Sequence, residues 1–296
     1  MTELKLSGLG VALITPFKED LDIDFEALAK VINHVIDGGC DYIVALGTTA
    51  ETPTLTEEEK ILLTDYIRTK VDGRVPLVIG IGGNNTKAVC EDIVKRDLTG
   101  YSAILSVTPY YNKPSQQGLL EHYRAIAEVS PLPVILYNVP GRTGVNLSAH
   151  TVIRLSSLYP KICGIKEASG NISISEEVIR GVSDSFMVIS GDDATTTKLM
   201  KTGGVGVISV LANAYPAQVK LLLDLCFEGN YDKAFEIQDV LNKIVGPLFE
   251  DGNPSGVKAA LYDLGLIKNI LRLPLTPVSE HVSYKIKEAA KIISSL

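Results

Sequence analysis

The chain has 296 residues, of which 46% are hydrophobic and 21% are charged, and its formal net charge is −7 at pH 7. This composition is typical of a globular protein with a substantial core, and it argues against a disordered chain. The negative charge argues against a nucleic acid partner, because no basic stripe is available to neutralise phosphates. Chemistry on a small molecule is therefore the better expectation.

The sequence contains no apolar run near the roughly 20 residues that a membrane span needs. Its first ten residues lack the apolar segment of a signal peptide. We therefore expect a cytoplasmic protein. In that compartment isolated cysteines stay reduced, and we interpret the four in this chain as small core residues: Cys40, Cys90, Cys163 and Cys226.

Apolar runs of strand length alternate with amphipathic stretches of helical length from the N-terminus to about residue 210. One helical pattern separates most neighbouring runs, which indicates strand-helix-strand crossovers and a parallel sheet. Eight such units favour closure into a (β/α)8 TIM barrel. The eight predicted strands are 10–14, 42–46, 76–81, 102–107, 133–137, 161–166, 186–190 and 205–208.

The remaining elements are predicted from helix starts and stops. Thr56 is followed by three glutamates, a pattern that predicts a capping box at the start of a helix. After residue 213 only helical patterns occur, so we expect a catalytic barrel over 1–229 and a C-terminal helical extension over 230–296. The helices predicted in this part of the chain are 215–228, 231–249, 255–266 and 279–293.

An eight-stranded parallel barrel places its chemistry at the C-terminal ends of its strands. Here those positions carry one amine, several hydroxyls and several glycines. They hold no His/Cys cluster for a metal, and the four histidines lack paired spacing. The candidate residues are Thr15, Gly47, Thr48, Thr49, Ala50, Glu51, Tyr110, Tyr111, Tyr137, Lys166, Gly191, Asp192 and Asp193.

Lys166 ends a short apolar run that is typical of a buried strand. Burial lowers the pKa of a lysine, and the neutral amine is a nucleophile that condenses with carbonyls. By strand parity Ile162, Gly164 and Lys166 share one face, and Gly164 is expected to leave space beside the amine. The alternative is a solvated or ion-paired lysine. Glu167 is an obvious partner for such a pair, although adjacent strand residues point to opposite faces.

Four segments of the chain resemble the dihydrodipicolinate synthases, within the pyruvate-dependent Schiff-base lyase family that includes N-acetylneuraminate lyase. The segments are 47–51 (Gly-Thr-Thr-Ala-Glu), 108–112 (Thr-Pro-Tyr-Tyr-Asn), 137–144 (Tyr-Asn-Val-Pro-Gly-Arg-Thr-Gly) and 164–170 (Gly-Ile-Lys-Glu-Ala-Ser-Gly). They follow the family's order across nearly the whole chain. The resemblance implies an enzyme that condenses pyruvate with L-aspartate 4-semialdehyde in the diaminopimelate and lysine pathway.

The resemblance also implies roles for individual residues. Lys166 corresponds to the lysine that forms an imine with pyruvate, so that no separate cofactor is needed. Tyr137 corresponds to the acid/base. Thr48, Thr49 and Tyr111 correspond to a hydroxyl relay, with Tyr111 reaching across from an adjoining subunit. The residues alone also allow an aromatic lid at Tyr137, a plain interface tyrosine at Tyr111 and helix-capping threonines.

The resemblance assigns the substrate contacts as well. Thr49 corresponds to a contact to the pyruvate carboxylate, and Gly191 and Ile208 correspond to lining of the pyruvate pocket. Arg142 offers a planar fork of donors for a second carboxylate, whereas a sugar acid calls for neutral hydroxyl partners. The alternative for Arg142 is a surface arginine that pairs with a helix end.

Two other functions compete with the synthase. One is a sister aldolase, such as an N-acetylneuraminate lyase, which uses the same imine with another aldehyde. The other is a catalytically inactive binding or scaffold protein. In the neuraminate lyases the Arg-Thr-Gly pattern at 142–144 is missing, so the sequence favours the synthase.

The family is typically a homotetramer, a dimer of dimers, and the resemblance implies this assembly here. Two departures from the family, Ala50 and Gly141, carry no reacting group. Members that lysine inhibits tend to have histidine where Lys60 stands and glutamate where Ala88 stands. Since a cation and a methyl group are poor hosts for a bound ammonium, the sequence predicts weak lysine feedback or none.

Overall fold

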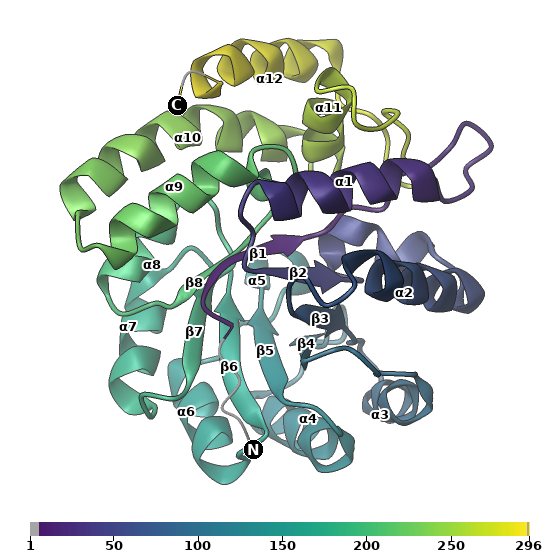
Figure 1. Ribbon diagram of the computed structural model, residues 1–296. Helices are drawn as coiled ribbons and strands as arrows, with labels where there is room; N and C mark the ends of the chain where they lie inside the picture. Colours follow the sequence, from purple (N-terminus) through teal and green to yellow (C-terminus); the bar gives the residue numbers. More distant parts are fainter. Residues whose placement is uncertain (1–5, 295) are drawn as a thin grey trace.

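The computed structural model describes residues 6–294 and 296. Its eight strands are all parallel and form a closed barrel in chain order, with helices packed around the outside (Figure 1). This confirms the predicted TIM barrel. The strands are β1 (Gly8–Ala12), β2 (Tyr42–Ala45), β3 (Leu77–Gly80), β4 (Ala103–Val107), β5 (Val134–Asn138), β6 (Ile162–Glu167), β7 (Met187–Ser190) and β8 (Gly206–Ser209).

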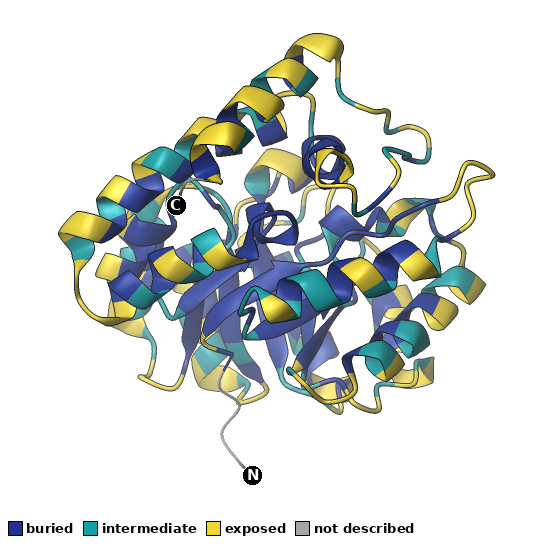
Figure 2. Ribbon diagram, turned by 45° about the horizontal axis from the view of Figure 1, so that its top comes forward, coloured by how far each residue is buried: buried dark blue, intermediate teal, exposed yellow. Residues whose placement is uncertain are grey.

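The strands are buried along nearly their whole length, as Figure 2 shows in dark blue. Helices cover the outer face and inward side chains fill the inner face, which explains why the strands are apolar runs without alternation. All eight predicted strands are confirmed. The first begins two residues earlier than expected, because Gly8 already pairs with Gly206 of β8. Ile14 lies beyond the ladder, and its backbone N–H donates instead to the side chain of Asn213.

Most of the helices that connect the strands begin at a residue whose side chain caps the helix, with α5 and α8 as the exceptions. The predicted capping box is present: Thr56 Oγ1 accepts from the Glu59 N–H at 3.2 Å, and the Glu59 carboxylate accepts from the Thr56 N–H at 2.9 Å. These helices are α1 (Phe25–Asp37), α2 (Glu57–Val71), α3 (Thr86–Lys95), α4 (Gln116–Val129), α5 (Pro140–Thr143), α6 (Ala149–Leu158), α7 (Ile172–Gly181) and α8 (Thr196–Lys201). Short 3-10 helices follow β2 and β8: η1 (Thr48–Ala50), η2 (Thr52–Thr54) and η3 (Leu211–Asn213).

Four helices complete the chain, as the sequence predicts: α9 (Pro216–Phe227), α10 (Tyr231–Glu250), α11 (Ser255–Asp263) and α12 (Glu280–Ile293). The boundary predicted at residues 229 and 230 falls in the turn between α9 and α10. One hydrophobic cluster includes Val31 of the barrel and both Ile244 and Ile286 of the extension. The extension therefore shares its core with the barrel layer. Among the described residues, no helix has the length and apolar character that a membrane crossing requires.

Candidate active site

Lys166 points into the interior of the barrel. It lies opposite Tyr137 of β5 and Ile189 of β7 in the strand register, and both of these neighbours belong to the cluster of inward-facing side chains. Only 5% of Lys166 is exposed. Within the described part of the chain, no carboxylate lies at ion-pair distance from its amine. The inward placement of Lys166 is confirmed, but the expectation that Ile162 shares its face was wrong, because the pairing of β6 with β5 shifts by one residue between Ile162 and Gly164 and leaves Ile162 in the outer hydrophobic cluster.

Tyr137 is the immediate neighbour of this amine. Lys166 Nζ lies 4.5 Å from the centroid of the Tyr137 ring. This distance is in the range of a cation–π contact and brings a phenol to the side of the amine. The aromatic-lid interpretation and the acid/base interpretation both require a ring at this place, so this contact does not distinguish them.

Glu167 does not pair with Lys166. Its carboxylate faces the other side of β6, where it accepts hydrogen bonds from Asn138 Nδ2 at 2.8 Å and from the Ser169 N–H at 2.7 Å. Burial raises the pKa of Glu167, although these donors partly oppose the shift. The sequence-based alternative of a Lys166–Glu167 ion pair is therefore not realised in the fold.

Glycine keeps room beside the amine, at a different position from the one predicted. A Cβ at Gly191 would lie 3.0 Å from both Cε and Cγ of Lys166, so a side chain there would press on the lysine. A Cβ at Gly164 would instead lie 2.7 Å from the carbonyl oxygen of Met187 in β7. Our expectation that Gly164 leaves space for the amine was wrong, because this glycine permits close packing of two strands. Ile208 is buried in the same inward cluster as Tyr137.

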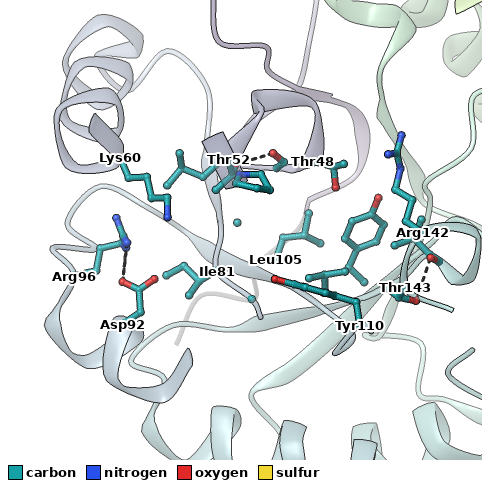
Figure 3. Close-up of a pocket in the computed structure, with 18 residues that line it drawn as sticks. Thr48, Thr52, Lys60, Ile81, Asp92, Arg96, Leu105, Tyr110, Arg142 and Thr143 are labelled. Atoms are coloured by element: carbon teal, nitrogen blue, oxygen red, sulfur yellow. Dashed lines mark hydrogen bonds and ion pairs between the residues drawn. The ribbon is translucent and has the colours of Figure 1, made fainter. Parts of the chain in front are cut away.

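A cavity of about 350 Å³ opens at the C-terminal ends of the strands. Tyr137, Thr48, Tyr110 and Arg142 contribute to its wall. In Figure 3 Arg142 lies at one side of the cavity, and Lys60, Asp92 and Arg96 lie at the other. Lys166 is outside this wall, and Tyr137 is the residue that belongs both to the cavity and to the contact with the amine.

The two threonines of the loop after β2 differ in exposure. Thr48 is half-buried and lines the cavity, whereas Thr49 is buried and its Oγ1 accepts a hydrogen bond from Asn253 Nδ2 at 3.0 Å. Neither hydroxyl caps the next helix, because both threonines lie inside η1 and the N-caps of η2 and α2 are Glu51 and Thr56. The helix-cap alternative is therefore excluded, and both hydroxyls remain available to a ligand or to a proton path.

Arg142 and Tyr111 occupy contrasting places. Arg142, on the short helix α5, lines the cavity, and its Nη2 lies 3.4 Å from the backbone oxygen of Asn253. Arg142 is nevertheless exposed, and Asn253 lies three residues beyond the end of α10, so the alternative of a surface arginine that pairs with a helix end remains open. Tyr111 is 85% exposed and has a φ of 71°, so the fold of one chain does not bring it to Lys166. A positive φ is uncommon for a bulky residue and commonly marks a functional constraint.

Comparisons with known proteins agree with the fold and with the family motifs described above. The family model described as the dihydrodipicolinate synthetase family matches residues 5–293. The chain belongs to this family. The 4-hydroxy-tetrahydrodipicolinate synthase of Parabacteroides distasonis is 49% identical to it, over 99% of this chain and 99% of the relative. Membership in the dihydrodipicolinate synthetase family confirms the resemblance inferred from four motifs and makes the protein an enzyme of the lyase class.

Solved structures agree with this family. The dihydrodipicolinate synthase from Thermotoga maritima superposes with a TM-score of 0.95 at 38% identity, covering 98% of this chain and 99% of that one. The chloride-inhibited dihydrodipicolinate synthase from Acinetobacter baumannii, solved in complex with pyruvate, gives a TM-score of 0.94 at 39% identity, with 99% and 100% covered. The barrel and its C-terminal helices are thus both part of the family fold.

Sequence reasoning missed the contribution of the extension to this region of the dihydrodipicolinate synthetase fold. Asn253 contacts Thr49 and Arg142, and Lys258 forms a fully buried ion pair with Glu51 of the β2 loop. A lysine within a predicted apolar helix was a weak signal for a buried pair. Nothing in the local sequence singled out Asn253, whose partners lie far away in the chain.

Proposed function

We propose that this enzyme is a 4-hydroxy-tetrahydrodipicolinate synthase that condenses pyruvate with L-aspartate 4-semialdehyde through a Schiff base on Lys166. The observation that carries the proposal is the buried, inward-facing amine of Lys166 against the ring of Tyr137. It occurs in a chain that is 49% identical to a curated synthase over nearly its full length. Lysine biosynthesis in the cytoplasm is the setting that we propose for the reaction.

The proposed chemistry begins with attack of the nitrogen lone pair of Lys166 on the ketone carbon of pyruvate. The resulting carbinolamine loses water and becomes a protonated imine, which is an electron sink. A proton then leaves the pyruvate methyl group, and the enamine so formed attacks the aldehyde carbon of the semialdehyde. Cyclisation by attack of the substrate's own amine on the imine carbon displaces the Lys166 amine. No cofactor beyond this covalent imine is required.

We assign the proton transfers to Tyr137. A phenol that gives up and takes back protons during the reaction needs neighbouring hydroxyls to deliver and remove them, so we include a relay in the proposal. Thr48 and Thr49 supply hydroxyls just after β2, at the same end of the barrel as Tyr137. We assign the last member of the relay to Tyr111 of a second copy, because in its own chain this side chain is 85% exposed and stands on a backbone of positive φ.

Pyruvate is the first substrate in this proposal. The related synthase from Acinetobacter baumannii, 39% identical, was solved in complex with pyruvate. Here we place the pyruvate carboxylate at Thr49 and its ketone carbon beside Lys166. The absence of a side chain at Gly191 leaves room for the ligand there, and the side chain of Ile208 forms a wall of the same space. The homotetramer typical of the family is the assembly that we propose, and a monomer should be nearly inactive because it lacks the partner's tyrosine.

A coupled steady-state assay tests the proposed function. Purified enzyme is given pyruvate with L-aspartate 4-semialdehyde, and in parallel pyruvate with N-acetylmannosamine. We expect turnover of the semialdehyde and none of the amino sugar. Preference for N-acetylmannosamine would show that the protein is the sister aldolase. No turnover with either acceptor would favour the catalytically inactive scaffold protein.

Arg142 should determine affinity for the second substrate. An Arg142→Lys variant keeps the charge but loses the planar fork, and charge-assisted bonds of this kind contribute about 1.5–3 kcal/mol. We therefore expect the KM for the semialdehyde to rise roughly 10- to 100-fold. Trapping of pyruvate by borohydride, measured without the semialdehyde, should keep its wild-type dependence on pyruvate. Equal losses for both substrates would contradict this division of roles.

Feedback by lysine should be weak. Lys60 lines the cavity and is ion-paired to Glu57 at 2.7 Å, and the nearby Ala88 offers no charge. An ammonium ligand would meet a cation and a methyl group at these two positions. Steady-state rates measured at millimolar lysine should remain close to those without it. Strong inhibition under these conditions would show that other side chains hold the effector.

A further inference from the structure

Asn253 joins two loops of the site that come from different strands. It lies between α10 and α11, at the start of the segment that contacts the loop after β2, and only 6% of it is exposed. Its Nδ2 donates to Thr49 Oγ1 at 3.0 Å, and its backbone oxygen lies 3.4 Å from Arg142 Nη2. One residue of the extension thus contacts both side chains that we assign to substrate carboxylates.

The extension is fixed to the same loop by a second, independent set of contacts. Lys258 of α11 is fully buried and ion-paired with Glu51, two residues after Thr49. The other oxygen of Glu51 accepts from the backbone N–H of Arg272 at 3.1 Å. The backbone at Asn253 is therefore held against the β2 loop without help from its own side chain, so the amide group is not needed merely to attach the extension.

The side-chain amide of Asn253 lowers the stability of the fold through one of its atoms, and packing alone does not explain why it is present. Asn253 Oδ1 is buried and has no hydrogen-bond partner among the described residues. An unpaired buried acceptor costs about 1–3 kcal/mol, which an apolar side chain of similar volume would avoid. The hydrogen bond from Asn253 Nδ2 to Thr49 Oγ1 is therefore the interaction that explains a polar side chain at this position.

The direction of that hydrogen bond determines what Thr49 can do. A hydroxyl has one proton and two lone pairs, whereas an amide NH₂ group can only donate. The bond from Asn253 therefore occupies a lone pair of Thr49 Oγ1 and leaves its proton free for an anionic oxygen. A carboxylate accepts only, so this is the polarity that pyruvate requires of its partner.

We propose that Asn253 is a positioning residue that keeps the Thr49 hydroxyl oriented as a donor to the pyruvate carboxylate, which makes the C-terminal extension part of the active site. This inference rests on the proposed function. The inference predicts that Asn253→Asp, which preserves the shape of the side chain, weakens pyruvate binding more than Asn253→Ala does. The introduced carboxylate would accept the Thr49 proton and would repel the carboxylate of pyruvate.

The test measures adduct formation with pyruvate alone, by borohydride trapping over a range of pyruvate concentrations. For Asn253→Ala, the half-saturating concentration should rise roughly five- to tenfold, as expected for loss of about 1 kcal/mol of orientation. For Asn253→Asp it should rise at least about tenfold beyond that, since a charged acceptor now competes for the same proton. The rate of trapping at saturating pyruvate should change much less.

Asn242→Ala is the matched control. Asn242 lies in the same extension and bonds to Gln238 and to the backbone oxygen of Ala194, away from the pyruvate contacts. It should bind pyruvate as the wild type does. If Asn253→Asp is milder than Asn253→Ala, or if both match the control, Asn253 only fills space and the inference is wrong. Should Asn253→Ala fail to fold, Asn253→Asp against wild type decides the matter alone. Failure of the wild-type enzyme to trap pyruvate would instead overturn the proposed function itself.

Discussion

Replacing Lys166 with alanine should abolish turnover, with a loss on the order of 10⁴-fold or more in kcat. The amine is the nucleophile in our proposal, and no other lysine in the described chain pairs with Tyr137 in the barrel register. The variant should fold, because Lys166 makes no ion pair among the described residues whose loss would leave a charge buried. A steady-state assay with pyruvate and the semialdehyde provides the measurement.

Lys161→Met is the control for this experiment. Lys161 precedes the same strand at its opposite end, where its amine donates to the backbone oxygen of Ser130. It should retain nearly wild-type kcat, even if stability falls slightly. Activity of Lys166→Ala within tenfold of wild type would exclude a Schiff base on this residue.

Replacing Lys258 with methionine should cause the largest loss of stability. Lys258 and Glu51 form a fully buried ion pair, and the ammonium also lies 4.3 Å from the ring centroid of Phe17. Burial lowers the pKa of Lys258 to about 8, because desolvation outweighs the attraction of Glu51. The amine is therefore still largely protonated at pH 7. Removing it leaves a buried carboxylate unpaired, at a cost of about 3–5 kcal/mol.

Urea unfolding at pH 7 measures this loss as a shift of the midpoint at unchanged slope. Lys285→Met, which breaks an exposed pair with Glu250, should cost less than about 1 kcal/mol. Adding Glu51→Gln to Lys258→Met should recover most of the stability, because a neutral amide no longer requires the cation and can still accept from Arg272. A double variant as unstable as the single one would show that packing, and not the unpaired charge, is responsible.

The barrel could be predicted from sequence because each strand is a short apolar run between two helical patterns. This signal is local and repeats around the barrel. The end of the first strand was less certain, since Leu13 and Ile14 are as apolar as the strand itself. Only the pairing of Gly8 with Gly206 shows where the ladder begins, and that pairing depends on a strand almost two hundred residues away.

The site was predictable only in part, for a similar reason. The family motifs placed Lys166, Tyr137 and Arg142 in the candidate site, since each stands at or just after the end of a strand. The interpretation of Gly164 was wrong because its constraint comes from the neighbouring strand. The contacts of Asn253 with Thr49 and of Lys258 with Glu51 span 204 and 207 residues. Such pairs are determined by tertiary packing and leave no local pattern.

Trapping of the pyruvate adduct by borohydride in the wild-type enzyme, followed by peptide mass spectrometry, tests the central claim most directly. Reduction of the imine should add the mass of one reduced pyruvyl group per chain, and the modified peptide should place it on Lys166. An adduct on any other residue, or no adduct at saturating pyruvate, would contradict the account.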